Sequence, residues 1–175
     1  MIVTVSGYNG AGKSAAAKLL AKQLGWEYYG MGLLMRADAK KRGMSIEEHD
    51  RFAADNPSID RALDKQVQAL GREEDIVVDA RAAWHFIPHS KKVFLVADEY
   101  ERARRAYSKA RDSEEYASVE EAAAYLRSRV EVLRSRLQEL YGVDVYNPEH
   151  FDVVIDTTQL SVQEVVAAIR EELQL

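Results

Sequence analysis

Three glycines, a lysine and a serine follow a short apolar run near the start of the chain, within residues 7–14. The segment matches the phosphate-loop pattern G-x-x-x-x-G-K-S in full. Glycines let backbone N–H groups turn inward around phosphate oxygens, and a helix N-terminus behind them adds a positive dipole. Lys13 is then suited to hold the β- and γ-phosphates, and the Ser14 hydroxyl to help coordinate Mg²⁺. The residues expected to bind the nucleotide are Gly7, Asn9, Gly10, Ala11, Gly12, Lys13, Ser14 and Ala15.

A phosphate loop occurs in several classes of protein, and the rest of the sequence narrows the choice. A GTPase would carry an Asn-Lys-x-Asp segment after a later strand, and the sequence has none. Motor ATPases usually need a larger domain and a strand that ends in paired acids, whereas Asp79 is followed by Ala80 and Arg81. A small kinase is the class that remains.

Basic residues are concentrated between positions 102 and 136, although the formal net charge of the chain is −5. Residues at helical spacing there are Arg102, Arg105 and Lys109, then Arg129 with Arg136 and Arg127 with Arg134. Phosphoryl transfer requires positive charge around three equatorial oxygens and little covalent chemistry from the protein. The catalytic candidates are therefore Lys13, Arg102, Arg105, Arg129 and Arg136. The alternative is that the arginines pair with neighbouring glutamates on a solvated helix surface.

Alternating strands and helices must position these residues. Short runs rich in β-branched residues predict strands over residues 2–6, 26–29, 75–79, 92–97 and 151–156. Apolar residues at helical spacing predict helices over 13–24, three or so within 30–70, one over 98–111, a long one from 118 to 142 and a last one after 161. This pattern indicates an α/β fold with a five-stranded parallel sheet covered by helices on both faces.

Several helix starts carry a capping pattern. Ser-x-x-Glu at residues 45–48, 118–121 and 161–164 predicts capping boxes, and Asn56 before Pro57 predicts an N-cap.

Composition limits the class of protein further. The 175 residues are 47% apolar, which suits one compact domain, and the absence of cysteine excludes disulfides and thiolate metal sites. The first residues lack a charged region followed by a long apolar stretch, and no segment approaches the length of a membrane span. We therefore expect a cytoplasmic monomer that acts on small molecules and binds neither membranes nor nucleic acid.

Five segments in order resemble the cytidylate kinases of the short archaeal type, a branch of the nucleoside monophosphate kinases related to adenylate kinase. They are residues 7–14, 32–36, 77–81, 141–144 and 151–158. The resemblance implies the P-loop nucleoside kinase fold, with residues 1–175 as a single kinase domain. It also implies a helical acceptor-binding arm at about residues 30–72 and a short lid at about residues 109–129.

The resemblance also implies roles for residues of the acceptor site. Arg36 and Arg81 would hold the phosphate of the acceptor monophosphate, because a planar, permanently charged fork suits a phosphate dianion. Their alternatives are a solvated helix arginine for Arg36 and a partner of Asp79 for Arg81. In the arm, Asp60 and Asp64 would read the base amino group or hold an arginine, or else belong to an ordinary acidic helix surface.

The activity implied is transfer of the γ-phosphoryl group of ATP to CMP or dCMP, with Mg²⁺. The alternatives are a kinase for AMP or UMP, and a nucleotide-binding module without turnover. Four residues depart from the usual pattern of the family and leave the identity of the acceptor open: Tyr8, Asn9, Ala80 and Lys109.

Overall fold

The computed structural model describes residues 1–108 and 116–175. Its five strands form one parallel sheet in the order β2-β3-β1-β4-β5. They are β1 (Ile2–Gly7), β2 (Glu27–Gly30), β3 (Ile76–Asp79), β4 (Lys91–Val96) and β5 (Val153–Asp156). The parallel sheet predicted from the sequence is therefore confirmed, and the predicted strand ends differ from these by one or two residues.

Helices connect the strands. They are α1 (Lys13–Leu24), α2 (Met31–Lys41), α3 (Ile46–Asp55), α4 (Pro57–Leu70), α5 (Ala83–Phe86), α6 (Glu99–Ser108), α7 (Val119–Tyr141) and α8 (Val162–Leu173), with a 3₁₀ helix η1 (Pro148–His150). Neither α5 nor η1 was predicted, because elements this short show no helical period. The predicted lid at about 109–129 lies partly outside the described residues, and its described part from residue 119 onward belongs to α7.

Side chains that alternate along the strands pack into two apolar layers, one on each face of the sheet. Val3, Val5 and Val77 pack with α1 and α8 on one face of the sheet. Ile2 and Ile76 point to the other face, where α4 and α5 cover them. Both faces of the sheet are thus buried by helices, as the continuous apolar strands predict.

The capping predictions are met in part. Complete capping boxes form at Ser45 and Ser161. At the start of α7 the Ser118 side chain accepts from the backbone of Glu121, but the Glu121 carboxylate accepts from the Ala117 N–H rather than closing the box. Asn56 stands at the N-cap of α4 and forms no side-chain cap, because its amide donates to the carbonyl of Phe52 at 2.8 Å. The predicted N-cap position, with Pro57 in the first turn, is confirmed.

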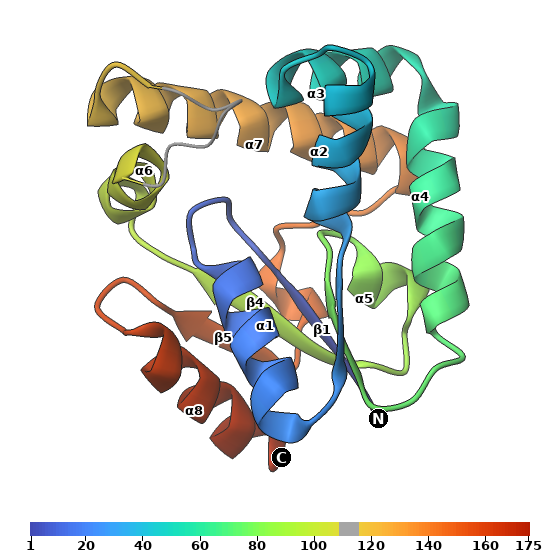
Figure 1. The fold of residues 1–175 in the computed structure, drawn as a ribbon, viewed down its shortest axis with the longest axis vertical. Helices are drawn as coiled ribbons and strands as arrows, with labels where there is room; N and C mark the ends of the chain where they lie inside the picture. Colours follow the sequence, from blue (N-terminus) through green and yellow to red (C-terminus); the bar gives the residue numbers. More distant parts are fainter. Residues whose placement is uncertain (109–115) are drawn as a thin grey trace.

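The helices α2, α3, α6 and α7 lie beyond the carboxyl ends of the strands. In Figure 1, α7 crosses the top of the molecule, with α6 near one end and α3 near the other, and α4 runs down one side. Ligands of open parallel sheets bind at this edge, where neighbouring connections run to opposite faces. No helix among the described residues is long and apolar enough to cross a membrane.

Candidate active site

The loop between β1 and α1 is held tightly on both sides. A Cβ on Gly7, at φ +134°, would overlap the backbone oxygen of Leu95 in β4. A Cβ on Gly10, at φ +85°, would lie 2.7 Å from the backbone oxygen of Arg102 in α6. Glycine is therefore required at both positions, for conformation and for space. The loop backbone follows a fixed path between β4 and α6.

Lys13 lies close to several arginine side chains. Its Nζ donates to the carbonyl oxygen of Tyr8 at 2.7 Å. Burial lowers the pKa of Lys13 to about 7; nearby Asp79 opposes this effect, while Arg81 and Arg129 add to it. An anion bound here would relieve this repulsion and restore the charged ammonium.

Ser14 meets an acidic residue from the neighbouring strand. The hydroxyl of Ser14 donates to Oδ2 of Asp79 at 2.5 Å, and the Tyr28 hydroxyl donates to the same oxygen at 3.1 Å. Hydroxyl and carboxylate oxygens are ligands that Mg²⁺ accepts, usually with the remaining positions filled by phosphates and water. Among the described residues no group of three or more His, Cys, Asp or Glu side chains is arranged to hold a metal. Ser14, Asp79 and the phosphates of a bound nucleotide could therefore together supply the ligands of a Mg²⁺ ion.

Sequence reasoning named Ser14 for the metal but not Asp79. A signal was available, since Asp79 is an acid at the carboxyl end of a strand directly beside β1. From the sequence, Asp79 was considered as a strand end without a second acid and as a possible partner of Arg81, but not as a metal ligand.

A cavity of about 260 Å³ opens next to the loop. Its lining residues include Asn9, Gly10, Gly12, Lys13, Ser14, Ala15, Arg36, Asp60, Arg81, Arg105, Arg129 and Arg136. The structure thus brings most of the expected binding and catalytic residues to one cavity, from six different segments of the chain. Lys109 lies outside the described residues.

The two arginines expected at the acceptor phosphate have different surroundings. Nη1 of Arg81 lies 3.7 Å from the sulfur of Met35, and no carboxylate of the described part of the chain forms an ion pair with Arg81. The alternative that Arg81 pairs with Asp79 is therefore not what the structure shows. The guanidinium of Arg36 folds back along α2, where a Cβ on Gly32 would lie 3.4 Å from Nη2.

Arg129 and Arg136 of α7 are held by the arm formed by α2, α3 and α4. Nε of Arg129 donates to Oδ2 of Asp50 at 2.7 Å, with side chains 10% and 4% exposed. Nη1 of Arg136 donates to the backbone oxygen of Asp50 at 2.8 Å, and its Nε lies 3.2 Å from Oδ2 of Asp60. Asp60 therefore holds an arginine, one of the two roles weighed for it. Burial raises the pKa of Asp60, although Arg136 opposes the effect.

Asp50 was missed from the sequence. It lies at position 50 and its partner at 129, and one acid among several in an amphipathic helix carries no local sign of a distant arginine.

Arg102 does not line the cavity, contrary to the expectation for a catalytic arginine. It is 9% exposed, its Nε donates to the carbonyl of Ala97 at 3.1 Å, and its guanidinium lies 4.9 Å from the centre of the Tyr8 ring. The physical reason is that its backbone packs directly on Gly10, which places its side chain behind the phosphate loop. Tyr8 in turn stacks on Tyr146 at 4.9 Å with 9° between the rings.

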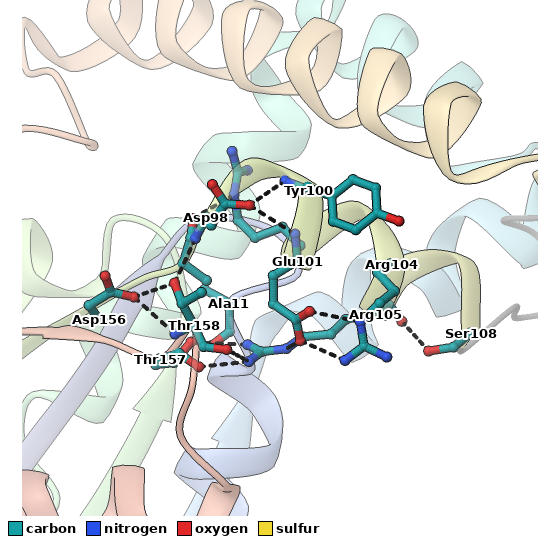
Figure 2. Close-up of polar contacts among 12 residues, drawn as sticks. Ala11, Asp98, Tyr100, Glu101, Arg104, Arg105, Ser108, Asp156, Thr157 and Thr158 are labelled. Atoms are coloured by element: carbon teal, nitrogen blue, oxygen red, sulfur yellow. Dashed lines mark hydrogen bonds and ion pairs between the residues drawn. The ribbon is translucent and has the colours of Figure 1, made fainter.

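Arg105 is tied to the loop that follows β5. Its guanidinium donates to Oε1 of Glu101 at 2.7 Å, to the Thr157 hydroxyl at 3.0 Å and to the Thr157 carbonyl at 2.6 Å (Figure 2). Hydrogen bonds from Arg104, then from Arg105, lower the pKa of Glu101 to about 2. Arg105 lines the first cavity and also a second one of about 430 Å³, which lies between the phosphate loop and Leu160.

The fold and the loop together define the class of protein: a P-loop kinase. The solved structure of shikimate kinase from Bacteroides thetaiotaomicron has a TM-score of 0.67 to this structure at 14% identity, covering 100% of this chain and 99% of that one, which is a likeness of fold. Residues 2–159 match the profile of the cytidylate kinase-like family, and the chain belongs to that family.

Two relatives illustrate this membership. Cytidylate kinase of Pyrococcus abyssi is 34% identical over 171 residues, which span 97% of this chain and 92% of the relative. Cytidylate kinase of Pyrobaculum neutrophilum is 36% identical over 168 residues, which span 95% of this chain and 89% of the relative. The resemblance inferred from the sequence motifs is thereby confirmed.

Proposed function

We propose that this protein is a nucleoside monophosphate kinase that transfers the γ-phosphoryl group of ATP to CMP or dCMP. The observation that supports the proposal is that the phosphate loop with Lys13 and the guanidinium groups of Arg36, Arg81, Arg129 and Arg136 line one cavity. We assign the loop as one anion site and Arg36 with Arg81 as the other, with Arg129 and Arg136 acting on the transferring group. One site suits the donor phosphates and the other suits a second phosphate that receives the transferred group.

The chemistry requires little beyond this arrangement. An oxygen of the acceptor phosphate, already anionic, forms a bond to the γ-phosphorus while the bond to the β,γ-bridging oxygen breaks, so no general base is needed. Lys13 and the loop amides hold the donor, and the α7 arginines balance the charge of the transferring group. Mg²⁺ on Ser14 and Asp79 would neutralise charge on the β- and γ-phosphates when bound.

Two further features support this proposal. The relatives named cytidylate kinase favour a cytidine nucleotide as acceptor. The second cavity adjoins Gly12 and Ala15 at the start of α1, so a nucleoside attached to phosphates in the loop can occupy it beside Arg105 and Thr158.

A coupled assay of ADP release with ATP, Mg²⁺ and a panel of monophosphates tests the proposal. We expect CMP or dCMP to raise turnover well above the ATP-only rate, and UMP and AMP to raise it less. If no pyrimidine monophosphate raises turnover, the cytidylate proposal is wrong.

Substituting Lys13→Ala separates a kinase from a binding module. We expect a loss of phosphoryl transfer of about 10³-fold, because a preorganised charge at the reacting phosphates is removed. Isothermal titration with ATP measures how much binding survives. A protein in which the wild type binds ATP and transfers nothing would be a binding module.

A further inference from the structure

Gly30 ends β2 and directly precedes α2, and the structure shows a reason of space for the glycine. The backbone there is extended, with φ −115° and ψ 100°, a conformation that any residue adopts. A Cβ at this position would overlap the hydroxyl oxygen of Tyr28 and would lie 2.8 Å from Cζ of the same ring. The end of the Tyr28 side chain therefore occupies the space in which a side chain at position 30 would begin.

The hydroxyl of Tyr28 reaches the carboxylate of Asp79 on the neighbouring strand. β2 pairs in parallel with β3, and Gly30 lies opposite Asp79 in the register. Since side chains two positions apart lie on the same face of a sheet, Tyr28 shares a face with Asp79. Its hydroxyl donates to Oδ2 of Asp79 at 3.1 Å, and the Ser14 hydroxyl donates to the same oxygen at 2.5 Å. Two hydroxyls from different elements thus hold one carboxylate oxygen.

The ring of Tyr28 is held in place away from the ligand cavity. It is half-buried and packs against the apolar layer that α1 and α8 share with the sheet. Nζ of Lys18 in α1 lies 5.5 Å from the centre of the ring. The described residues that line the first cavity include Ser14 and Asp79 but not Tyr28. An effect of Tyr28 on a bound nucleotide therefore passes through Asp79.

We propose that Tyr28 is a positioning residue that orients Asp79 toward the Mg²⁺ ion of the bound nucleotide, and that Gly30 provides the space for it. This inference rests on the nucleotide and Mg²⁺ binding of the proposed function. Ser14 is itself assigned to the ion, whereas Tyr28 supplies the carboxylate with a donor that takes no part in binding the ion. Groups that hydrogen-bond to a metal ligand fix its orientation, and their loss typically weakens metal binding by about 10–100-fold.

The next residue of β2 offers a matched control. Tyr29 also carries a hydroxyl, but its side chain lies on the opposite face of the sheet and donates to the exposed carboxylate of Glu27. Tyr29→Phe therefore removes a hydroxyl from the same strand and leaves the contacts of Asp79 intact.

The test is the affinity of Mn²⁺ for the complex of the protein with ATP, measured by electron paramagnetic resonance with protein in excess and no acceptor. Mn²⁺ accepts the same oxygen ligands as Mg²⁺. Tyr28→Phe keeps the ring and loses only the hydroxyl, so we expect the Kd of Mn²⁺ to rise about 10-fold. The affinity for ATP in EDTA, measured by calorimetry, should stay the same because the phosphate loop is unchanged. Tyr29→Phe should alter neither value.

Gly30→Ala tests the same contact without changing the tyrosine. The added Cβ must displace the Tyr28 hydroxyl, so the Kd of Mn²⁺ should rise by a similar factor. When Gly30→Ala is combined with Tyr28→Phe, the two effects should not multiply, because both remove one hydrogen bond. Thermal unfolding shows whether each variant is folded.

The outcomes separate the role of Tyr28 from the proposed function. An unchanged Mn²⁺ affinity in Tyr28→Phe overturns the role of Tyr28 while the kinase stands. An equal loss of ATP affinity in EDTA also overturns it, since the hydroxyl would then support the whole loop. If Tyr28→Phe does not fold, an unchanged Mn²⁺ affinity in Gly30→Ala overturns the role. A wild type that binds Mn²⁺ with ATP and phosphorylates no monophosphate overturns the proposed phosphoryl transfer alone.

Discussion

The phosphate loop and the proposed acceptor side of the cavity are built in different ways. The loop is one continuous segment of backbone, and its shape is fixed by glycines that press against β4 and α6. The acceptor side is an assembly of side chains from α2, α4, α7 and the segment after β3, oriented by buried pairs such as Asp50 with Arg129. The shape of one region is set by backbone packing, and the other contains guanidinium groups, of which those of Arg129 and Arg136 are held by acids.

This difference has an energetic consequence. A backbone site contains no ion pair, so a substitution in it leaves no buried charge without its partner. The acceptor side depends on pairs in which each buried ion needs the other, and removal of one partner leaves an uncompensated charge. We therefore expect substitutions of the supporting acids to affect stability and catalysis together.

On the acceptor side, and for stability, the largest effect is expected for Asp50→Ala. It removes the acceptor of the Arg129 Nε hydrogen bond at a site where both side chains are at most 10% exposed. We expect a loss of about 3 kcal/mol in the free energy of unfolding, as for other broken buried pairs. Arg129 would also lose its orientation, so kcat should fall by about 10–100-fold. Denaturant unfolding and steady-state kinetics measure the two effects.

Two variants serve as controls for Asp50. Asp50→Asn retains an oxygen that can accept from Arg129 and should recover part of both losses. Asp55→Ala lies on the exposed end of the same helix and should behave as wild type. A folded Asp50→Ala protein with normal kcat would show that the pair is structural and that Arg129 needs no support from α3.

The contrast between the loop and the paired side chains also explains which parts of the site could be predicted from the sequence. The loop was predicted residue by residue because its chemistry depends on spacing within eight positions. Arg129 and Arg136 were found from their helical spacing, but Asp50, 79 positions away from Arg129, was not. Helical spacing also grouped Arg102 with Arg105, and only the packing of α6 on Gly10 shows that Arg102 lies behind the loop. Contacts between distant elements depend on the assembled fold, which periodicity does not describe.

A smaller effect is expected on the donor side, in the pH dependence of nucleotide binding. Burial lowers the pKa of Lys13 in the ligand-free protein to about 7 from its usual value of 10.5. A polyphosphate requires the ammonium form and should raise this pKa again. Above pH 7 binding must therefore take up a proton, and affinity should fall about fivefold between pH 7 and pH 8.

Calorimetry in two buffers of different ionisation enthalpy measures that proton uptake directly. The uptake should disappear in Lys13→Met, and its absence in the wild type at pH 8 would contradict the shifted pKa. The sign for stability is opposite to that for binding. The unfolded chain binds more protons than the native one between about pH 7 and 10.5, so the contribution of Lys13 to unfolding free energy rises with pH there.

The smallest effect on stability and kinetics is expected for substitution of Tyr8. This residue belongs to the phosphate loop, but its ring packs away from the loop. One side of its ring lies under Arg102 of α6, it stacks on Tyr146, and it meets Phe94 of β4 edge-on at 5.6 Å. The unusual aromatic residue in the loop thus links it to α6 and to the segment that follows α7. Tyr8→Leu should lower the free energy of unfolding by about 1 kcal/mol through loss of these ring contacts.

Because the ring links the two regions, Tyr8→Leu should raise KM for ATP and for the acceptor together, each by a few-fold. Tyr8→Phe keeps the stack, and the Tyr8 hydroxyl bonds to no described residue, so this variant should resemble wild type. Initial rates over a grid of both substrates separate the two KM values. If Tyr8→Leu raises only the KM for ATP, Tyr8 supports only the phosphate loop. The phosphate loop and the acceptor side would then be structurally independent of each other.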